Sequence, residues 1–155
     1  MTRLNIGCGR DYKEGWINTD ISREVKADAY FDIGKDSITE EDKYGAGYMG
    51  DNEVDEIYIS GVLEQIGDND QLIHAMNECW RVLKPGGMMT VIVPNAKHAI
   101  AHRDPMDVRK FTRETFFYFA DGSREYKLYG SVYASSRGRI CTSKRTNGTS
   151  SLCRW

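Results

Sequence analysis

The sequence has none of the features that mark a metal-bound, disulfide-linked or membrane-spanning protein. Its four cysteines lie far apart with no C-x-x-C pair, and its histidines are not grouped, so we expect neither a zinc site nor a disulfide framework. The thiols are expected to be reduced. No apolar run approaches the length that a bilayer requires, so no membrane association is predicted.

An excess of charge of one sign is lacking as well. The formal net charge is −2 with acidic and basic residues interleaved, which disfavours binding to nucleic acid through its phosphate backbone. Because the first apolar run follows Met1 almost at once, we expect no export signal and a cytoplasmic protein. With 155 residues, 40% of them hydrophobic, the chain is predicted to form a single domain over residues 1–155.

The most informative run that is present is a strand that leads into two glycines. The letters L-N-I-G-C-G at residues 4–9 place Gly7 and Gly9 directly after an apolar segment. Lacking side chains, these residues allow a tight turn and a close approach of backbone N–H groups to a ligand. The run predicts a nucleotide-binding turn, with an ordinary turn as the alternative.

Short apolar runs alternate with connections further along the chain. Strands are predicted at residues 16–18, 29–32, 54–60 and 88–93. The first three strands are joined by connections too short for full crossover helices. A polar connector over residues 34–52 contains an S-x-x-E capping box that starts at Ser37. Apolar residues recur at helical spacing over residues 68–84, which predicts an amphipathic helix that ends at the run P-G-G.

The chain after residue 94 is less regular. Residues 95–111 are polar and are predicted to form a lid or substrate loop. A short aromatic helix follows, with Thr112 as N-cap and a hydrophobic staple between Phe111 and Phe116. Strands are predicted at 126–133 and 139–145, and a hairpin turn at 146–149 leads to a last strand that ends at Trp155. The pattern is typical of an α/β sheet with antiparallel strands at one edge.

Acidic residues end two of the predicted strands. Ligands of such sheets bind beyond the carboxyl ends of the parallel strands. Asp20 ends the second strand, where a carboxylate can accept hydrogen bonds from both hydroxyls of a ribose. Asp32 ends the third strand and can accept from an adenine amino group. Capping of a local turn is the alternative role for both carboxylates.

Four runs together resemble the class I S-adenosylmethionine-dependent methyltransferases. They are L-N-I-G-C-G at 4–9, G-W-I-N-T-D at 15–20, D-N-E-V-D-E-I-Y at 51–58 and W-R-V-L-K-P-G-G at 80–87. The last run is the most specific, because a helix that ends in R-V-L-K-P-G-G before the fifth strand is a hallmark of that superfamily. The resemblance implies a Rossmann-like, doubly wound, mostly parallel sheet with strand order 3-2-1-4-5-7-6, an antiparallel edge hairpin and reduced helices between strands 1, 2 and 3.

The resemblance also implies an activity and a cofactor. The expected reaction is methyl transfer from S-adenosylmethionine to a small-molecule or glycan-type acceptor, with S-adenosylhomocysteine as product. The ribose is expected on Asp20, with the adenine beside Ile21, Asp32 and Ile33. The residues expected to contact the cofactor are Gly7, Cys8, Gly9, Asp20, Ile21, Asp32, Ile33, Ser60 and Gly61.

The sequence departs from the family pattern at several positions. Many members carry an acid where Asn5 stands and a third glycine where Asp11 stands, and histidines often match Gly61 and Gln65. The shortened crossovers leave the sheet face beneath strands 1 to 3 under-protected. We therefore expect either a homodimer through that face or an exposed apolar patch that includes Trp16 or Tyr30.

Methyl transfer needs alignment more than a catalytic side chain, but a hydroxyl acceptor would benefit from a general base. His102 and Asp104 are the expected catalytic residues, with His98 in reserve, and a solvated loop is the alternative. Basic side chains of the same segment are candidates to bind an anionic acceptor or to form a solvated face: Arg103, Arg109 and Lys110. Glu64 follows the fourth strand at the expected rim of the site, where an ordinary helix N-terminal acid is the alternative.

Two other functions compete with methyl transfer. A non-catalytic methyltransferase-like binding or assembly module is compatible with the short crossovers and the absent histidines. A nicotinamide-dependent oxidoreductase would need glycine or alanine at Tyr12 and has no use for the run at 80–87.

Overall fold

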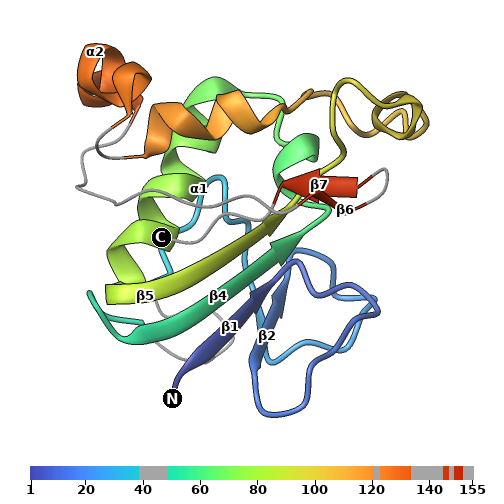
Figure 1. Ribbon diagram of the computed structural model, residues 1–155. Coiled ribbons are helices and arrows are strands. Elements are labelled where there is room, and N and C mark those ends of the chain that lie inside the picture. Colours follow the sequence, from blue (N-terminus) through green and yellow to red (C-terminus); the bar gives the residue numbers. More distant parts are fainter. Residues whose placement is uncertain (39–48, 121–122, 134–144, 147–148, 152–155) are drawn as a thin grey trace.

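The central element is a five-stranded parallel sheet with the order β3-β2-β1-β4-β5 (Figure 1). The computed structural model describes residues 1–38, 49–120, 123–133, 145–146 and 149–151. The strands are β1 (Arg3–Ile6), β2 (Ile17–Asp20), β3 (Ala29–Tyr30), β4 (Val54–Ser60) and β5 (Leu83–Ile92). Every neighbouring pair among these strands is parallel. The expected order of the first five strands is confirmed.

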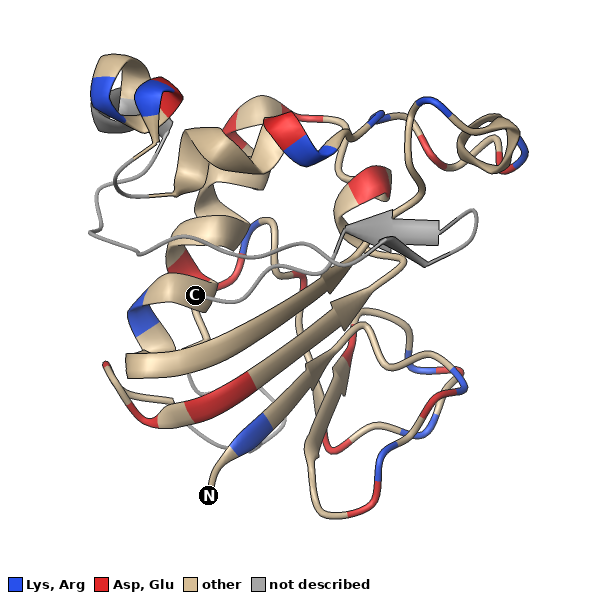
Figure 2. Ribbon diagram, viewed as in Figure 1, with Lys and Arg blue, Asp and Glu red and all other residues tan. Residues whose placement is uncertain are grey.

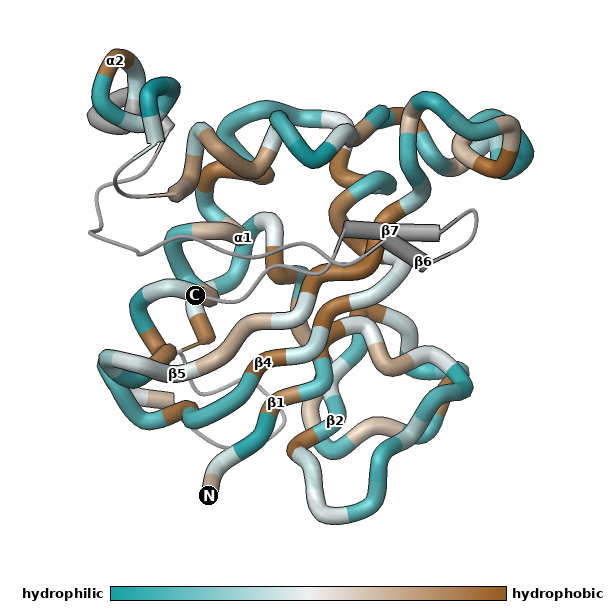
Figure 3. Tube along the Cα trace, in the orientation of Figure 1, coloured by the Kyte–Doolittle hydropathy of each residue, from teal (hydrophilic) through white to brown (hydrophobic). Residues whose placement is uncertain are grey.

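One helix covers one face of this sheet. The helix α1 (Asn69–Val82) begins at Asp68, whose side chain accepts a hydrogen bond from the Gln71 backbone N–H at 3.0 Å. Its buried residues pack against alternate residues of β1, β4 and β5, and Figure 3 shows hydrophobic residues running along β4 and β5. The core on this face includes Leu4, Ile6, Ile57, Ile59, Leu72, Met76, Cys79, Met89 and Val91. The predicted amphipathic helix is confirmed.

The end of α1 differs from the prediction. The helix ends at Val82, and Leu83 already has extended backbone with ψ of 130°, so no glycine caps the helix. The run P-G-G at 85–87 belongs to β5, which starts five residues earlier than the predicted strand at 88–93. The residue before a proline avoids helical backbone, and a proline without an N–H is tolerated in an edge strand. Val54 lies opposite Leu83 and Glu56 lies opposite Met88, so β5 bulges between these pairs.

Two buried asparagines organise the opposite face beneath β1 and β2. Residues 7–16 and 21–28, which connect β1 to β2 and β2 to β3, contain no helix, as expected from their length. Asn5 and Asn18 are paired in register and are 1% and 0% exposed. Asn5 Nδ2 donates to Asn18 Oδ1 and to the Asp11 carbonyl, both at 2.9 Å, and Asn18 Oδ1 also accepts from the Lys13 N–H. These bonds hold the first loop against the sheet in place of a crossover helix.

Two arginines, one in β1 and one in the loop after β2, lie on aromatic rings in this region. Figure 2 shows that charged residues are frequent in this part of the molecule, whereas β5 carries few. The Arg3 guanidinium carbon lies 5.1 Å from the Trp16 ring centre, and the Arg23 carbon lies 5.0 Å from that of Tyr30. Both rings are half-buried. Association of a second copy with this face stays a prediction.

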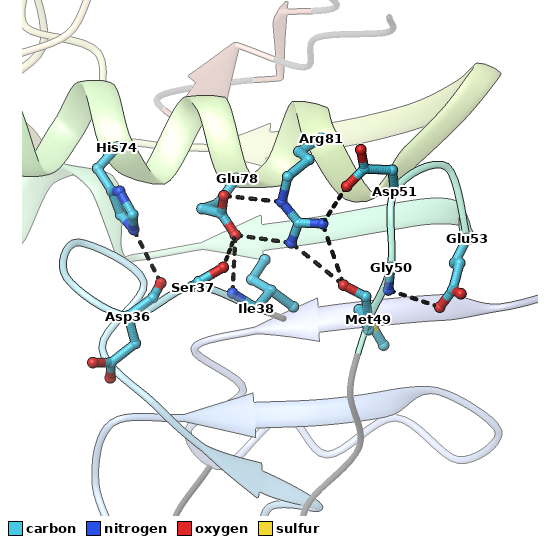
Figure 4. Close-up of polar contacts among 10 residues, drawn as sticks. All are labelled: Asp36, Ser37, Ile38, Met49, Gly50, Asp51, Glu53, His74, Glu78 and Arg81. Atoms are coloured by element: carbon cyan, nitrogen blue, oxygen red, sulfur yellow. Dashed lines mark hydrogen bonds and ion pairs between the residues drawn. The ribbon is translucent and has the colours of Figure 1, made fainter. Parts of the chain in front are cut away.

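A polar network connects α1 to the described residues on either side of positions 39–48 (Figure 4). The Glu78 carboxylate accepts from the Ser37 hydroxyl and the Ile38 N–H, each at 2.9 Å. Arg81 donates to both oxygens of Glu78, at 3.0 and 2.9 Å, and to Asp51 at 2.8 Å. Burial opposes ionisation of Glu78, but the hydrogen bonds from Arg81, Ile38 and Ser37 hold its pKa below the usual value. The network thus attaches residues distant in sequence to one helix.

The last part of the chain contains one wrong prediction. Residues 126–133 form most of the helix α2 (Arg124–Tyr133), not a strand. Aromatic and β-branched residues suggested a strand, but the tyrosines at 126, 129 and 133 recur at helical spacing, and the Tyr129 ring lies 6.0 Å from that of Tyr118. The aromatic helix is confirmed as the 3₁₀ helix η3 (Arg113–Phe119), where Phe111 and Phe116 stack at 5.4 Å.

The terminal hairpin is antiparallel, as predicted. It joins β6 (Arg145–Thr146) to β7 (Thr149–Ser151) in a separate two-stranded sheet beside β5 (Figure 1). The predicted strand at 139–145, apart from its last residue, lies outside the described residues. The same holds for the turn residues 147–148, the end of the last predicted strand at 152–155 and the capping-box acid Glu40. None of the described helices has the length and apolar character needed to cross a bilayer.

Candidate functional site

The carboxyl ends of β1, β2 and β4 meet at one edge of the sheet. The turn after β1 and the last residue of β2 are linked there, because the Gly9 N–H donates to Asp20 Oδ2 at 2.8 Å. The other carboxylate oxygen, Oδ1, accepts from the Ser22 N–H, also at 2.8 Å. The structure therefore brings the predicted glycine turn into direct contact with Asp20, the residue predicted to bind the ribose. Each carboxylate oxygen keeps a further lone pair for a ligand.

Three glycines at this edge have left-handed backbone. The φ values of Gly7, Gly9 and Gly61 are +65°, +50° and +72°. A Cβ on Gly9 or Gly61 would meet no heavy atom within 4 Å, whereas a Cβ on Gly7 would lie 2.2 Å from Val62 Cγ2. Gly7 is thus needed for packing against the segment after β4. Gly9 and Gly61 leave open space in which a ligand can approach the backbone.

Cys8 lies inside the same turn but is not available as a nucleophile. The side chain is buried, and its Sγ lies 3.5 Å from the Lys26 carbonyl oxygen. Burial, followed by the nearby Asp20 carboxylate, raises the pKa of the thiol above its usual value. A protonated, buried thiol is suited to packing rather than to catalysis.

The residues expected near the adenine have different surroundings. Ile21 is 67% exposed, but Ile33 is 5% exposed and packs in the core, so only the former has a side chain open to a ligand. Asp32 caps its own turn, since Oδ1 accepts from the Gly34 N–H at 3.0 Å and Oδ2 pairs with Lys35 at 2.9 Å. In this structure Asp32 therefore has the turn-capping role that was the alternative to adenine binding. Ser60 ends β4 opposite Ile92 of β5.

Residues 95–111 form a segment that we call the 95–111 loop. It is held by hydrogen bonds at both ends and along one side. Asn95 and Phe111 form an isolated bridge, and the Ala96 N–H donates to the Phe111 carbonyl at 2.7 Å. The Arg109 N–H donates to the Glu64 carbonyl at 2.9 Å, and its guanidinium donates to the Ile66 carbonyl at 2.9 Å. The loop therefore lies against η1 (Leu63–Gln65), the 3₁₀ turn after β4.

Two basic residues considered as anion ligands have structural partners instead. The Arg109 guanidinium also donates to Gly67 O and Asn69 Oδ1, both at 3.1 Å. Lys110 Nζ donates to the carbonyl oxygens of Ala101 and Asp107. Both side chains hold the 95–111 loop in shape. These contacts weigh against an anionic acceptor at this position.

The two expected catalytic residues are exposed on the 95–111 loop. His102 Nε2 lies 3.3 Å from the Ala96 carbonyl oxygen, and Asp104 Oδ1 accepts from the Met106 N–H at 2.8 Å. His98 accepts from the Ile100 N–H at the start of η2 (Ala99–His102). All three side chains make local loop contacts. Their role in catalysis stays a prediction.

Glu64 is the titratable residue with the most unusual surroundings near this edge. It is 3% exposed, and within the described part of the chain its Oε2 has no hydrogen-bond partner. Burial raises its pKa to about 7, and the carboxylates of Asp107 and Asp104 add to the shift. The helix-terminus role considered for Glu64 does not account for this burial. Its place in the apolar run V-L-E-Q-I at 62–66 is the sequence signal that indicates a buried acid.

Comparisons with known proteins agree with this architecture. A solved S-adenosylmethionine-dependent methyltransferase from Archaeoglobus fulgidus is 23% identical with a TM-score of 0.56, over 74% of this chain and 57% of that one. A second from Aquifex aeolicus is 15% identical with a TM-score of 0.57, over 99% and 81%. The YcgJ protein from Bacillus subtilis is 18% identical with a TM-score of 0.50, over 99% and 87%. At these identities the similarity establishes the fold.

The first of these comparisons also bears on length, because this chain spans less than two thirds of the Archaeoglobus protein. No protein of curated function matches the sequence. The family model for the methyltransferase domain matches residues 4–91, which is more than half of the chain. That match covers the glycine turn, Asp20, Glu64 and the run W-R-V-L-K-P-G-G at 80–87. The chain therefore belongs to the methyltransferase domain family.

Proposed function

We propose that this chain binds S-adenosylmethionine over the turn at Gly7–Gly9 and transfers its methyl group to a small-molecule or glycan-type acceptor. The observation that carries the proposal is the contact between Gly9 and Asp20 below the open space at Gly9. Membership of the methyltransferase domain family supports the same assignment. The product that leaves the site is S-adenosylhomocysteine.

Each predicted cofactor residue has a distinct role in this proposal. The backbone of Gly7, Cys8 and Gly9 faces the methionine end of the cofactor, and the open space at Gly9 allows its close approach. Asp20 accepts from the ribose hydroxyls in charge-assisted hydrogen bonds while it keeps its bond to Gly9. Ile21 supplies an apolar contact for the adenine.

The remaining cofactor residues lie at the neighbouring strand ends. We assign Asp32 as the acceptor of a hydrogen bond from the adenine amino group. Its carboxylate oxygens keep free lone pairs for this bond besides the contact with the Gly34 N–H. The backbone of Ile33 continues this edge of the site, while its side chain stays in the core. Ser60 and Gly61 border the sulfonium end of the cofactor.

The protein's main contribution to the reaction is alignment. Methyl transfer is an in-line displacement at carbon, so holding the acceptor atom opposite the sulfur supplies most of the rate. A hydroxyl acceptor would gain roughly two to four powers of ten from a general base, and His102 and Asp104 are the proposed groups for that case. The 95–111 loop that carries them would serve as the substrate loop.

Calorimetric titration with S-adenosylmethionine and S-adenosylhomocysteine tests the proposal. We expect wild type to bind both ligands and Asp20→Asn to bind each of them about tenfold or more weakly, because a charge-assisted bond to the ribose is lost. Asp11→Asn, an equal charge change at an exposed residue of the loop between β1 and β2, is the control and should retain affinity. Thermal unfolding of each variant shows whether the fold is intact.

Two results would contradict the assignment. Unchanged affinity in Asp20→Asn would refute the ribose contact. Absence of binding by wild type at millimolar ligand would instead favour the non-catalytic binding or assembly module, which the reduced crossovers between β1, β2 and β3 allow.

A further inference from the structure

Three carboxylates extend from the surface to the interior where the 95–111 loop meets η1. Asp104 is exposed, Asp107 is 9% exposed and Glu64 is 3% exposed. The charges of both aspartates act on Glu64, whose Oε2 is without a hydrogen-bond partner among the described residues. We refer to these three residues as the acidic cluster. Among the described residues, none of these three carboxylates forms an ion pair.

Two cations of the same loop are committed to other groups. Arg109 follows Asp107 closely, but its guanidinium bonds to the Ile66 and Gly67 carbonyls and to Asn69. Lys110 bonds to the Ala101 and Asp107 carbonyls. In the described part of the chain, neither side chain forms an ion pair with the acidic cluster. The acidic cluster is thus free of ion pairs with these two side chains.

The acidic cluster lies next to the proposed cofactor site. Glu64 is two residues from Val62, whose side chain packs against Gly7 so closely that a Cβ there would be 2.2 Å from Val62 Cγ2. The backbone of Glu64 is in turn bonded to Arg109 of the 95–111 loop. Glu64 thus stands between the glycine turn and the loop expected to contact substrate.

We propose that the acidic cluster receives a basic nitrogen of the methyl acceptor, and that Glu64 takes the proton which this nitrogen must lose before it attacks. This inference rests on the proposed methyl transfer and narrows its acceptor to a small amine. Three carboxylates attract an alkylammonium ion and repel a phosphate or a sugar acid. The acceptor enters past the exposed Asp104 toward the buried Glu64.

The proposed step is balanced in atoms and electrons. An ammonium nitrogen gives a proton to Glu64 Oε2 and becomes a neutral amine with a free electron pair. That pair forms the new N–C bond while the C–S bond breaks and its electrons go to sulfur, which becomes the neutral thioether of S-adenosylhomocysteine. The methylated nitrogen carries the positive charge, and Glu64 later releases its proton to solvent. A carboxyl group with a pKa near 7 is matched to this exchange at neutral pH.

The test compares an amine with its isosteric alcohol in the presence of saturating S-adenosylhomocysteine. The probes are n-butylammonium chloride and 1-butanol, and binding is followed by NMR of the ¹³C-labelled glutamate side-chain carboxyl groups. We expect wild type to bind butylammonium about tenfold or more tightly than butanol, with a shift of the Glu64 signal. Glu64→Gln should lose this preference because it removes the charge with little change in shape.

The control is Glu56→Gln, the same chemical change at a half-buried residue near the start of β4, and it should keep the preference for the amine. Equal binding of the two probes by wild type, including no binding of either, would overturn the inference. Retention of the preference in Glu64→Gln would overturn it too. Failure of wild type to bind S-adenosylhomocysteine, measured first, would instead mark failure of the proposed function.

Discussion

Replacing Glu64 by glutamine should change how the stability of this protein depends on pH. In the folded protein the carboxyl group has a pKa of about 7, mainly because it is buried, whereas its ordinary value is 4.5. The folded state therefore binds this proton more tightly than the unfolded state does. The contribution of Glu64 to stability is greatest below pH 4.5, decreases as the pH rises from 4.5 to 7, and is constant above that range.

The size of the effect follows from the two pKa values. Each tenfold change in proton affinity corresponds to about 1.4 kcal/mol, so ionisation of Glu64 in the folded state costs up to about 3 kcal/mol. Glutamine resembles the protonated acid and does not titrate. The free energy of unfolding of Glu64→Gln minus that of wild type should accordingly increase by up to about 3 kcal/mol between pH 4.5 and pH 8.

Urea unfolding of both proteins at intervals of pH measures this difference. Other groups, such as Glu78, titrate in both proteins and cancel when the two free energies are subtracted. Glu56→Gln, the same chemical change at a half-buried residue of β4, serves as the matched control for the substitution itself. If Glu64→Gln gave a constant difference, the carboxyl group would titrate as an ordinary exposed acid, and the argument from its burial would be refuted.

Two further substitutions test the contacts that stabilise the sheet. Asn5→Asp should lower the free energy of unfolding by about 2 kcal/mol in urea titrations, because a carboxylate would face the oxygens of Asn18 and Asp11 without a donor. Asn95→Asp, where the side chain accepts from the Lys97 N–H through Oδ1, should be nearly neutral, and equal losses in the two variants would contradict this account. Arg81→Met should cost about 2 kcal/mol at pH 7 and less as acid protonates Glu78, which the same titrations at pH 4 would detect. A loss independent of pH would show that packing, not charge, is the contribution of Arg81.

The local sequence was sufficient for much of the scaffold. The runs at 4–9, 54–60 and 68–84 predicted β1, β4 and α1, because periodicity reports directly which residues face a core. The strand order came from the resemblance of the motifs to a family. The start of β5 and the helix α2 were missed, since a proline-glycine run and a tyrosine-rich run are each compatible with more than one backbone conformation.

Some features of the candidate site were likewise predictable from the sequence, and others were visible only in the structure. The sequence by itself predicted the glycine turn and the carboxylate of Asp20 at the neighbouring strand end, because these residue types suit the nucleotide-binding turn that we propose. Only the tertiary structure decided that Asn5 supports a loop, that Arg109 and Lys110 bind carbonyl groups, and that Glu64 lies buried beside Asp107. Burial and the identity of a polar partner depend on segments brought together from different parts of the chain, and no local pattern contains that information.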